Sequence, residues 1–135
     1  GKGILSLGNI YAKRDWGHAK DYVEMQWRIL QQKKPDDYVI ATGIQYSIKQ
    51  FINLTANKLN YKIIWRGKGL KEKGYNINGF PVIECDKNYF RPLDVNTLLG
   101  DAKKARIKLK WKPKKNIHDL IDEMILSEYS FFNET

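Results

Sequence analysis

Two arginines fall at predicted loop ends, where their side chains could bind phosphate. Arg14 lies between a Gly8-Asn9 turn and the start of a predicted helix, and Arg91 follows the last predicted strand. Because a planar guanidinium holds phosphate through two parallel hydrogen bonds, two arginines at one loop rim are what a diphosphate-bearing ligand requires. Asp94, three residues after Arg91, carries a carboxylate that can accept hydrogen bonds from ribose or sugar hydroxyls. The alternative for each arginine is a surface ion pair, which the spacing alone does not exclude.

The other reactive side chains form no recognisable catalytic or metal-binding set. His18 has two aspartates nearby and could act as a general base, but a histidine at a helix start is more often a structural hydrogen-bonding group. Cys85 lies in a predicted apolar strand, where a thiol usually packs without reacting. With one cysteine and two histidines, the chain can form no internal disulfide and shows no metal-ligand spacing. We therefore expect no catalytic residue and no metal site.

Three common cofactor and phosphate motifs are absent from the sequence. It contains no G-x-G-x-x-G turn, no Walker-type loop, and no tyrosine followed four positions later by lysine. A chain without these groups is expected to bind no dinucleotide and to run no cofactor-dependent chemistry by itself.

The composition is typical of one soluble domain with a strong positive charge. The 135 residues are 42% hydrophobic, which is enough for a core, and no apolar run reaches the roughly 18 residues of a membrane span. The single cysteine fits a cytoplasmic protein best. A formal charge of +9 implies an anionic partner, either a nucleotide sugar or nucleic acid. Eight basic residues lie between Lys103 and Lys115, and such a run is either a polyanion-binding surface or, more often, a solvated face.

Apolar spacing predicts three helices. The first begins after Gly17 and ends before Pro35. Its apolar face combines residues at three- and four-residue spacing: Ala19, Tyr22, Val23, Trp27 and Leu30. Three charged residues are placed away from that face: Asp21, Glu24 and Arg28. The second helix follows a capping box of Ser47 and Gln50, and a final apolar stripe predicts the third from Ile117.

Short β-rich runs predict four strands, at 4–9, 38–41, 61–65 and 80–85, with a loop rich in glycine and lysine before the last of them. We expect the strands near Tyr38, Ile63 and Ile83 to pair in parallel, because strands alternate with helices along the chain. The segment 105–113 is ambiguous. Its alternating apolar and cationic residues favour a strand, whereas Asp101 is typical of a helix N-cap. The predicted class is α/β.

One long motif is specific enough to indicate a family. The run 12–24 reads Ala-Lys-Arg-Asp-Trp-Gly-His-Ala-Lys-Asp-Tyr-Val-Glu and follows Leu7-Gly8-Asn9. Together with shorter motifs it resembles the GDP-mannose 4,6-dehydratase family over nearly the whole chain. These shorter motifs lie at 37–43, 67–69, 89–92, 99–101, 104–105 and 111–113. The resemblance favours a helix ending near Trp111 for the ambiguous segment.

The resemblance implies a partial enzyme. That family consists of extended short-chain dehydrogenases, in which an NADP-binding Rossmann domain precedes a smaller GDP-sugar-binding region. Residues 1–135 would be this C-terminal region plus the last Rossmann helix and strand. The N-terminal domain, with its NADP and the catalytic residues, would lie outside the chain, and apolar patches that it covers would be exposed. The intact homo-oligomer would convert GDP-mannose to GDP-4-keto-6-deoxymannose, whereas this chain alone would be inactive.

The resemblance also assigns roles to single residues. Arg14 and Arg91 would contact the GDP diphosphate, Asp94 would serve the ribose, and Asn9 would contact the substrate.

Three positions depart from the family pattern. Tyr11 stands where the family commonly has Asp, Asp94 is one methylene shorter than the usual Glu, and Asn96 replaces a frequent Asp. These differences leave open a related substrate such as a GDP-heptose. A basic module that binds nucleic acid through the run from Lys103 to Lys115 is the alternative from another class. That alternative explains only one charge run, so we expect no specific nucleic-acid partner. We also expect no membrane association, because no apolar run is long enough to span a bilayer.

Overall fold

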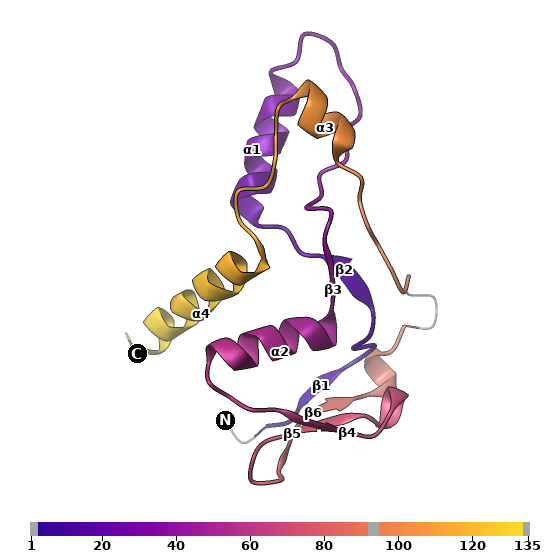
Figure 1. The fold of residues 1–135 in the computed structure, drawn as a ribbon, viewed down its shortest axis with the longest axis vertical. Coiled ribbons are helices and arrows are strands. Elements are labelled where there is room, and N and C mark those ends of the chain that lie inside the picture. Colours follow the sequence, from indigo (N-terminus) through magenta and orange to yellow (C-terminus); the bar gives the residue numbers. More distant parts are fainter. Residues whose placement is uncertain (1–2, 92–94, 134–135) are drawn as a thin grey trace. The chain divides into compact units, whose positions relative to one another are not determined.

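The computed structural model describes residues 3–91 and 95–133 and shows mixed α/β structure (Figure 1). The chain forms two compact units, and each is built from two separate segments. We call the first the sheet unit, made of Gly1–Lys13 and Ser47–Thr97, and the second the helical unit, made of Arg14–Tyr46 and Leu98–Thr135. The predicted α/β class is confirmed.

The sheet unit is built on four short strands. They are β1 (Leu5–Leu7), β4 (Ile64–Arg66), β5 (Lys73–Tyr75) and β6 (Pro81–Cys85), and they lie in the order β1-β6-β5-β4. Strands β1 and β6 pair in parallel, with Leu5 opposite Ile83, whereas β5 pairs antiparallel with both β4 and β6. Two single-turn 3₁₀ helices, Gly69–Lys71 and Lys87–Tyr89, flank β5 and β6 along the chain.

The expected parallel pairing of the strands near Tyr38, Ile63 and Ile83 is wrong. The region expected to be a loop contains β5, which lies between β4 and β6 and pairs antiparallel with each. Only a few residues connect these strands, and a parallel pair needs a crossover of about a dozen residues or more. The run 38–41 belongs to no strand, because no other described segment of this chain pairs with it. Ala41 is nevertheless buried in the core of the helical unit.

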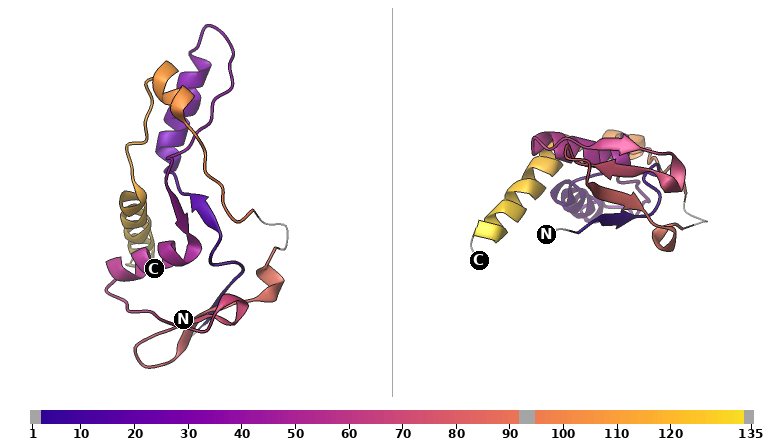
Figure 2. Two further views of the ribbon diagram at one scale, coloured as in Figure 1. Left: turned by 45° about the vertical axis from the view of Figure 1, so that its right-hand side comes forward. Right: turned by 90° about the horizontal axis from the view of Figure 1, so that it is seen from below.

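Helix α2 (Ile48–Lys58) runs beside the sheet (Figure 2) and begins as the sequence predicts. The Ser47 hydroxyl accepts a hydrogen bond from the Gln50 amide at 3.1 Å, and the Gln50 side chain accepts one from the Ser47 amide at 2.7 Å. This capping box satisfies two amides that the first turn would otherwise leave unpaired. The helix ends where Asn60 turns to a positive φ of 52°. The next amide, of Tyr61, then donates to the Ala56 carbonyl at 2.8 Å.

Two strands that the sequence did not predict, β2 (Lys13–Asp15) and β3 (Gln45–Ser47), pair with each other in a separate two-stranded sheet. Each has only three residues, which is too short for an alternating pattern to be recognised. Arg14 therefore lies on a strand and not in a loop.

The helical unit contains α1 (Ala19–Leu30), α3 (Lys103–Lys108) and α4 (Ile117–Asn133). Its core comprises Met25, Ala41, Ala102, Ala105, Leu109 and Trp111. Of the ambiguous segment 105–113, residues 105–108 are helical and residues 109–113 are not, so the helix that the family resemblance implies is present but shorter. The helix ends at Lys108, short of Trp111, because Lys110 has a φ of 50°, which a right-handed helix cannot contain.

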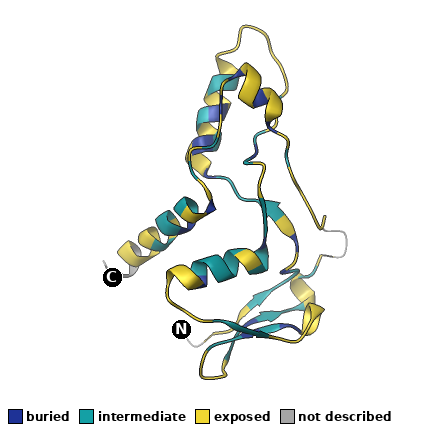
Figure 3. Ribbon diagram, viewed as in Figure 1, coloured by how far each residue is buried: buried dark blue, intermediate teal, exposed yellow. Residues whose placement is uncertain are grey.

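Helix α1 carries both buried and exposed residues (Figure 3), but the apolar face predicted for it is not the face that this chain buries. Val23, Trp27 and Leu30 are 61%, 60% and 79% exposed, whereas Met25 is fully buried and Asp21 nearly so. Asp21 can be buried because its carboxylate accepts hydrogen bonds from the Lys114 and Lys115 amides, both at 2.9 Å. The residues Val23, Trp27 and Leu30 form an exposed apolar stripe, and exposed patches of this kind were expected.

Candidate functional site

Asn9 and Arg91 lie in the same corner of the sheet unit. The chain at Gly8 passes so close to Tyr89 that a Cβ atom at position 8 would lie 2.2 Å from the Tyr89 carbonyl oxygen. Only glycine fits such an approach, because any side chain would clash with the neighbouring backbone. Asn9 follows Gly8 directly and exposed Arg91 comes two residues after Tyr89, so this contact brings two of the predicted site residues together.

The segment after Asp94 reaches the same corner. The Asn9 side-chain amide donates to the Asn96 side-chain oxygen at 3.4 Å, and the Lys13 amide donates to the Asn96 carbonyl at 2.8 Å. Asp94 itself lies outside the described residues. Three stretches of chain therefore meet here, around Asn9, Arg91 and Asn96.

Arg14 is half-buried on β2 and belongs to the helical unit, so its convergence with Arg91 stays a prediction. The next residue, Asp15, holds the loop after the run 38–41. Its carboxylate accepts hydrogen bonds from the Thr42 hydroxyl at 2.6 Å, the Thr42 amide at 3.0 Å and the Gly43 amide at 2.8 Å. The loop bends there because Gly43 adopts a φ of 82°. Asp15 thus fixes the residue beside Arg14, a role that sequence reasoning missed.

Replacing Asp15 by asparagine is expected to destabilise the helical unit by about 1.5–3 kcal/mol, because hydrogen bonds to a charged acceptor are lost. Asparagine keeps one acceptor oxygen but turns a donor toward one of the two amides. Urea denaturation measures the loss, and hydrogen exchange at the Thr42 and Gly43 amides should speed up locally. Asp37→Asn, at an exposed aspartate of the same unit, is the control and should change neither. Equal stability of the two variants would show that the three hydrogen bonds do not hold the loop.

A buried ion pair supports the chain next to Asn9. Glu72 is only 4% exposed, and its carboxylate accepts hydrogen bonds from the Tyr11 hydroxyl and from Lys49 Nζ, the latter at 2.6 Å. Burial opposes ionisation of Glu72, but the hydrogen bonds from Lys49 and Tyr11 outweigh it and lower the pKa of this carboxyl below 4.5. The bond to the carboxylate raises the pKa of the Tyr11 hydroxyl. Tyr11, which departs from the family pattern, thus has a structural partner of its own.

His18 and Cys85 are placed as structural groups. His18 is buried at the start of α1, where its Nδ1 accepts from the Lys20 amide at 3.1 Å and its Nε2 lies 3.0 Å from Glu123. With Nδ1 accepting, Nε2 carries the proton and donates it, so neither nitrogen is left to act as a base. Burial raises the pKa of the Cys85 thiol, which keeps the less reactive protonated form. Within 3–91 and 95–133, no group of three potential ligands could hold a metal ion.

Acidic neighbours occupy much of the basic run from Lys103 to Lys115. Lys104 and Lys108 both pair with Asp36, at 2.5 and 3.1 Å, and lower the pKa of that carboxyl to about 2. Further pairs join Arg106 to Asp101, Lys114 to Glu24 and Lys115 to Glu123. Five of the eight cations thus already have a carboxylate partner, which weakens the case for a polyanion surface.

Comparison with known proteins decides the family. A family model described as GDP-mannose 4,6 dehydratase matches residues 1–124 of this chain. The chain belongs to that family. It is 48% identical over 124 residues to GDP-mannose 4,6 dehydratase 2 of Caenorhabditis elegans, covering 92% of this chain and 32% of the relative. It is 45% identical over 135 residues to GDP-mannose 4,6-dehydratase of Vibrio cholerae, covering 92% of this chain and 36% of that protein. The chain therefore spans about a third of the length of its family relatives.

Solved structures share the fold at low identity. A UDP-glucose-4-epimerase from Stenotrophomonas maltophila with bound NAD matches 98% of this chain and 37% of its own, with a TM-score of 0.70 and 12% identity. RMD from Pseudomonas aeruginosa, complexed with NADPH, matches 87% of this chain and 33% of its own, with a TM-score of 0.63 and 19% identity. The chain thus shares its fold with about a third of each of these two proteins. None of the described helices is both long and apolar enough to cross a bilayer.

Proposed function

We propose that this chain is the GDP-sugar-binding part of a GDP-mannose 4,6-dehydratase, which converts GDP-mannose to GDP-4-keto-6-deoxymannose with NADP. The observation that carries the proposal is the family match along residues 1–124, together with relatives of that name at 48% and 45% identity. The enzyme is a lyase, acts in the cytoplasm and assembles as a homo-oligomer. A related GDP-sugar such as a GDP-heptose is the alternative substrate.

In this proposal the corner at Asn9 and Arg91 binds the nucleotide. Arg91 and Arg14 hold the diphosphate, whereas Asp94 accepts hydrogen bonds from the ribose and Asn9 from the substrate. Two features support this assignment: Gly8 brings the Asn9 and Arg91 segments together, and Arg91 is exposed to an incoming ligand. Diphosphate binding by two guanidinium groups fixes the nucleotide and presents the sugar to the reacting groups.

The cofactor is held by a portion of the protein outside this chain. The sequence has no glycine-rich dinucleotide-binding turn, and none of its residues is proposed to touch NADP. When bound, the cofactor supplies hydride transfer to and from the sugar. The apolar stripe of Val23, Trp27 and Leu30 is the surface that this other portion covers, because exposed side chains of this size are otherwise costly in water.

The test compares the isolated chain with the complete enzyme. We expect GDP-mannose and NADP to give the 4-keto-6-deoxy product with the complete enzyme, and no detectable product with residues 1–135 alone. Mass spectrometry of the nucleotide sugar detects the loss of water. Product from the isolated chain would refute the assignment of catalysis to another portion. If the complete enzyme dehydrates a GDP-heptose but not GDP-mannose, then a GDP-heptose replaces GDP-mannose as the proposed substrate.

A further inference from the structure

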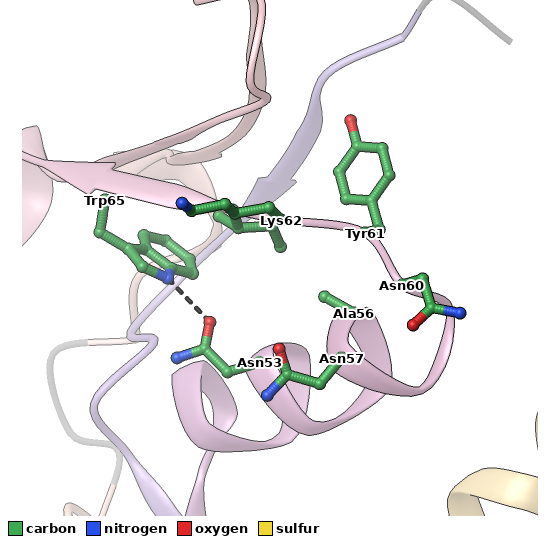
Figure 4. Close-up of a pocket in the computed structure, with 8 residues that line it drawn as sticks. Asn53, Ala56, Asn57, Asn60, Tyr61, Lys62 and Trp65 are labelled. Atoms are coloured by element: carbon green, nitrogen blue, oxygen red, sulfur yellow. Dashed lines mark hydrogen bonds between the residues drawn. The ribbon is translucent and has the colours of Figure 1, made fainter.

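A pocket of about 570 Å³ lies between the C-terminal half of α2 and the start of β4, inside the sheet unit (Figure 4). None of Asn9, Arg14 and Arg91 lines it. Its polar and aromatic lining residues are Asn53, Asn57, Asn60, Tyr61, Lys62 and Trp65. The proposed nucleotide-binding function does not use this pocket.

Three primary amides give the pocket its hydrogen-bonding character. Asn53 and Asn57 are four residues apart on α2 and therefore share one face of the helix (Figure 4). The Trp65 Nε1 donates to the Asn53 Oδ1 at 2.8 Å, which fixes the amide and leaves its two N–H donors for a ligand. Asn57 and Asn60 add both donors and acceptors. A sugar hydroxyl is also both donor and acceptor, so neighbouring hydroxyls match this set.

The charge of the lining excludes one class of ligand. Among the described residues that line the pocket, Lys62 is the one charged side chain and none carries a carboxylate. A cationic ligand would find no partner there, because burying a charge is costly without an opposite charge. A neutral or acidic ligand fits.

Two neighbouring pockets, which we call the groove, share the aromatic ring of Tyr61. Tyr61, which points away from α2 in Figure 4, also lines a second pocket of about 600 Å³ together with Asn76 and Phe80. Tyr61 and Phe80 are 43% and 66% exposed. Exposed rings flanked by amides suit the two sides of a sugar, since its C–H face packs against a ring while its hydroxyls bind polar groups. The Tyr61 ring then lies between two neighbouring subsites and lines both of them.

We propose that this groove binds a saccharide, with one sugar unit in each pocket, separately from the nucleotide site. The proposal is tested on the complete protein by saturation-transfer NMR with a neutral mannotriose, in the presence of saturating GDP. We expect transfer to the sugar protons to persist with GDP. Asn57→Ala is expected to weaken binding by roughly two- to tenfold, as for the loss of a neutral hydrogen bond, and Tyr61→Ser should weaken it as well.

The matched control is Asn88→Ala, which removes an exposed asparagine of the same unit that is not among the lining residues of either pocket and should leave binding unchanged. Alanine at position 57 favours the helix, so weaker sugar binding by Asn57→Ala cannot be attributed to loss of helix α2. No transfer to mannotriose, loss of transfer on adding GDP, or equal transfer with all three variants would overturn the proposal. Stronger saturation transfer to an unstructured asparagine-rich peptide than to mannotriose would also overturn the proposal. GDP binding itself is a separate readout, and its failure would count against the proposed function alone.

Discussion

Arg91→Lys is expected to weaken GDP binding to the complete enzyme by about ten- to a hundredfold, although it keeps the positive charge. Lysine offers a single ammonium group, which cannot reproduce the paired hydrogen bonds of a guanidinium to phosphate. Arg14→Ala should produce a loss of similar size. Isothermal titration of GDP measures both affinities, and thermal unfolding of each variant separates lost binding from lost folding.

The matched control is Arg66→Lys, which makes the same arginine-to-lysine change at a site outside the proposed nucleotide-binding corner. Arg66 is exposed on β4, at the opposite edge of the sheet from β1, and lies over the Tyr75 ring at 5.2 Å. Its replacement should leave GDP affinity unchanged. If Arg14→Ala and Arg91→Lys also bind GDP like the unmodified enzyme, these arginines form only surface ion pairs, which contribute at most about 1 kcal/mol to stability.

Lys49→Met is expected to lower the free energy of unfolding by roughly 3 kcal/mol, because it leaves the buried Glu72 carboxylate without its cation. The Glu72 side chain is 5% exposed and that of Lys49 24%, so water replaces little of the lost interaction. The matched control is Lys73→Met. Lys73 pairs with Glu84 at 2.9 Å, but the two side chains are 42% and 29% exposed, and its loss should cost no more than about 1 kcal/mol.

The cost of Lys49→Met should depend on pH in a defined direction. The pKa of Glu72 is lowered in the folded chain, so its stabilising contribution is present above 4.5 and is lost as pH falls through the lower folded value. In the variant, burial without a cation favours the neutral carboxyl. The difference between the two proteins should thus be largest near neutral pH and shrink in acid. A difference that is constant with pH would assign the effect to packing of the lysine stem.

Local signals predicted the helices well because their causes lie within a few residues. The capping box at Ser47 and the apolar stripe from Ile117 depend on neighbours three or four positions away, and the structure confirms both helices. Strand pairing was predicted poorly. The direction of β4 and β6 depends on β5, whose three residues include a lysine and a glycine and carry no strand pattern.

The candidate site shows the same division between local and distant causes. The phosphate-binding chemistry of Arg14 and Arg91 follows from their residue type alone. The approach of Gly8 to Tyr89 could not be predicted, because those two residues are far apart in the sequence. The α1 face was misassigned for a related reason. Whether Asp21 or Trp27 is buried is decided by partners distant in the chain, such as the amides of Lys114 and Lys115.

The interleaving of the two units restricts how the chain can be made and cut. Each unit combines an early segment with a late one, so no single peptide-bond cleavage releases either unit intact. A ribosome must also deliver β6 before β1 can find its parallel neighbour, since Leu5 pairs with Ile83. Such distant pairing is slow to form, because the intervening chain loses entropy before any contact compensates for it. The pair of β1 with β6 can therefore form only after all of α1 and α2 have been synthesised.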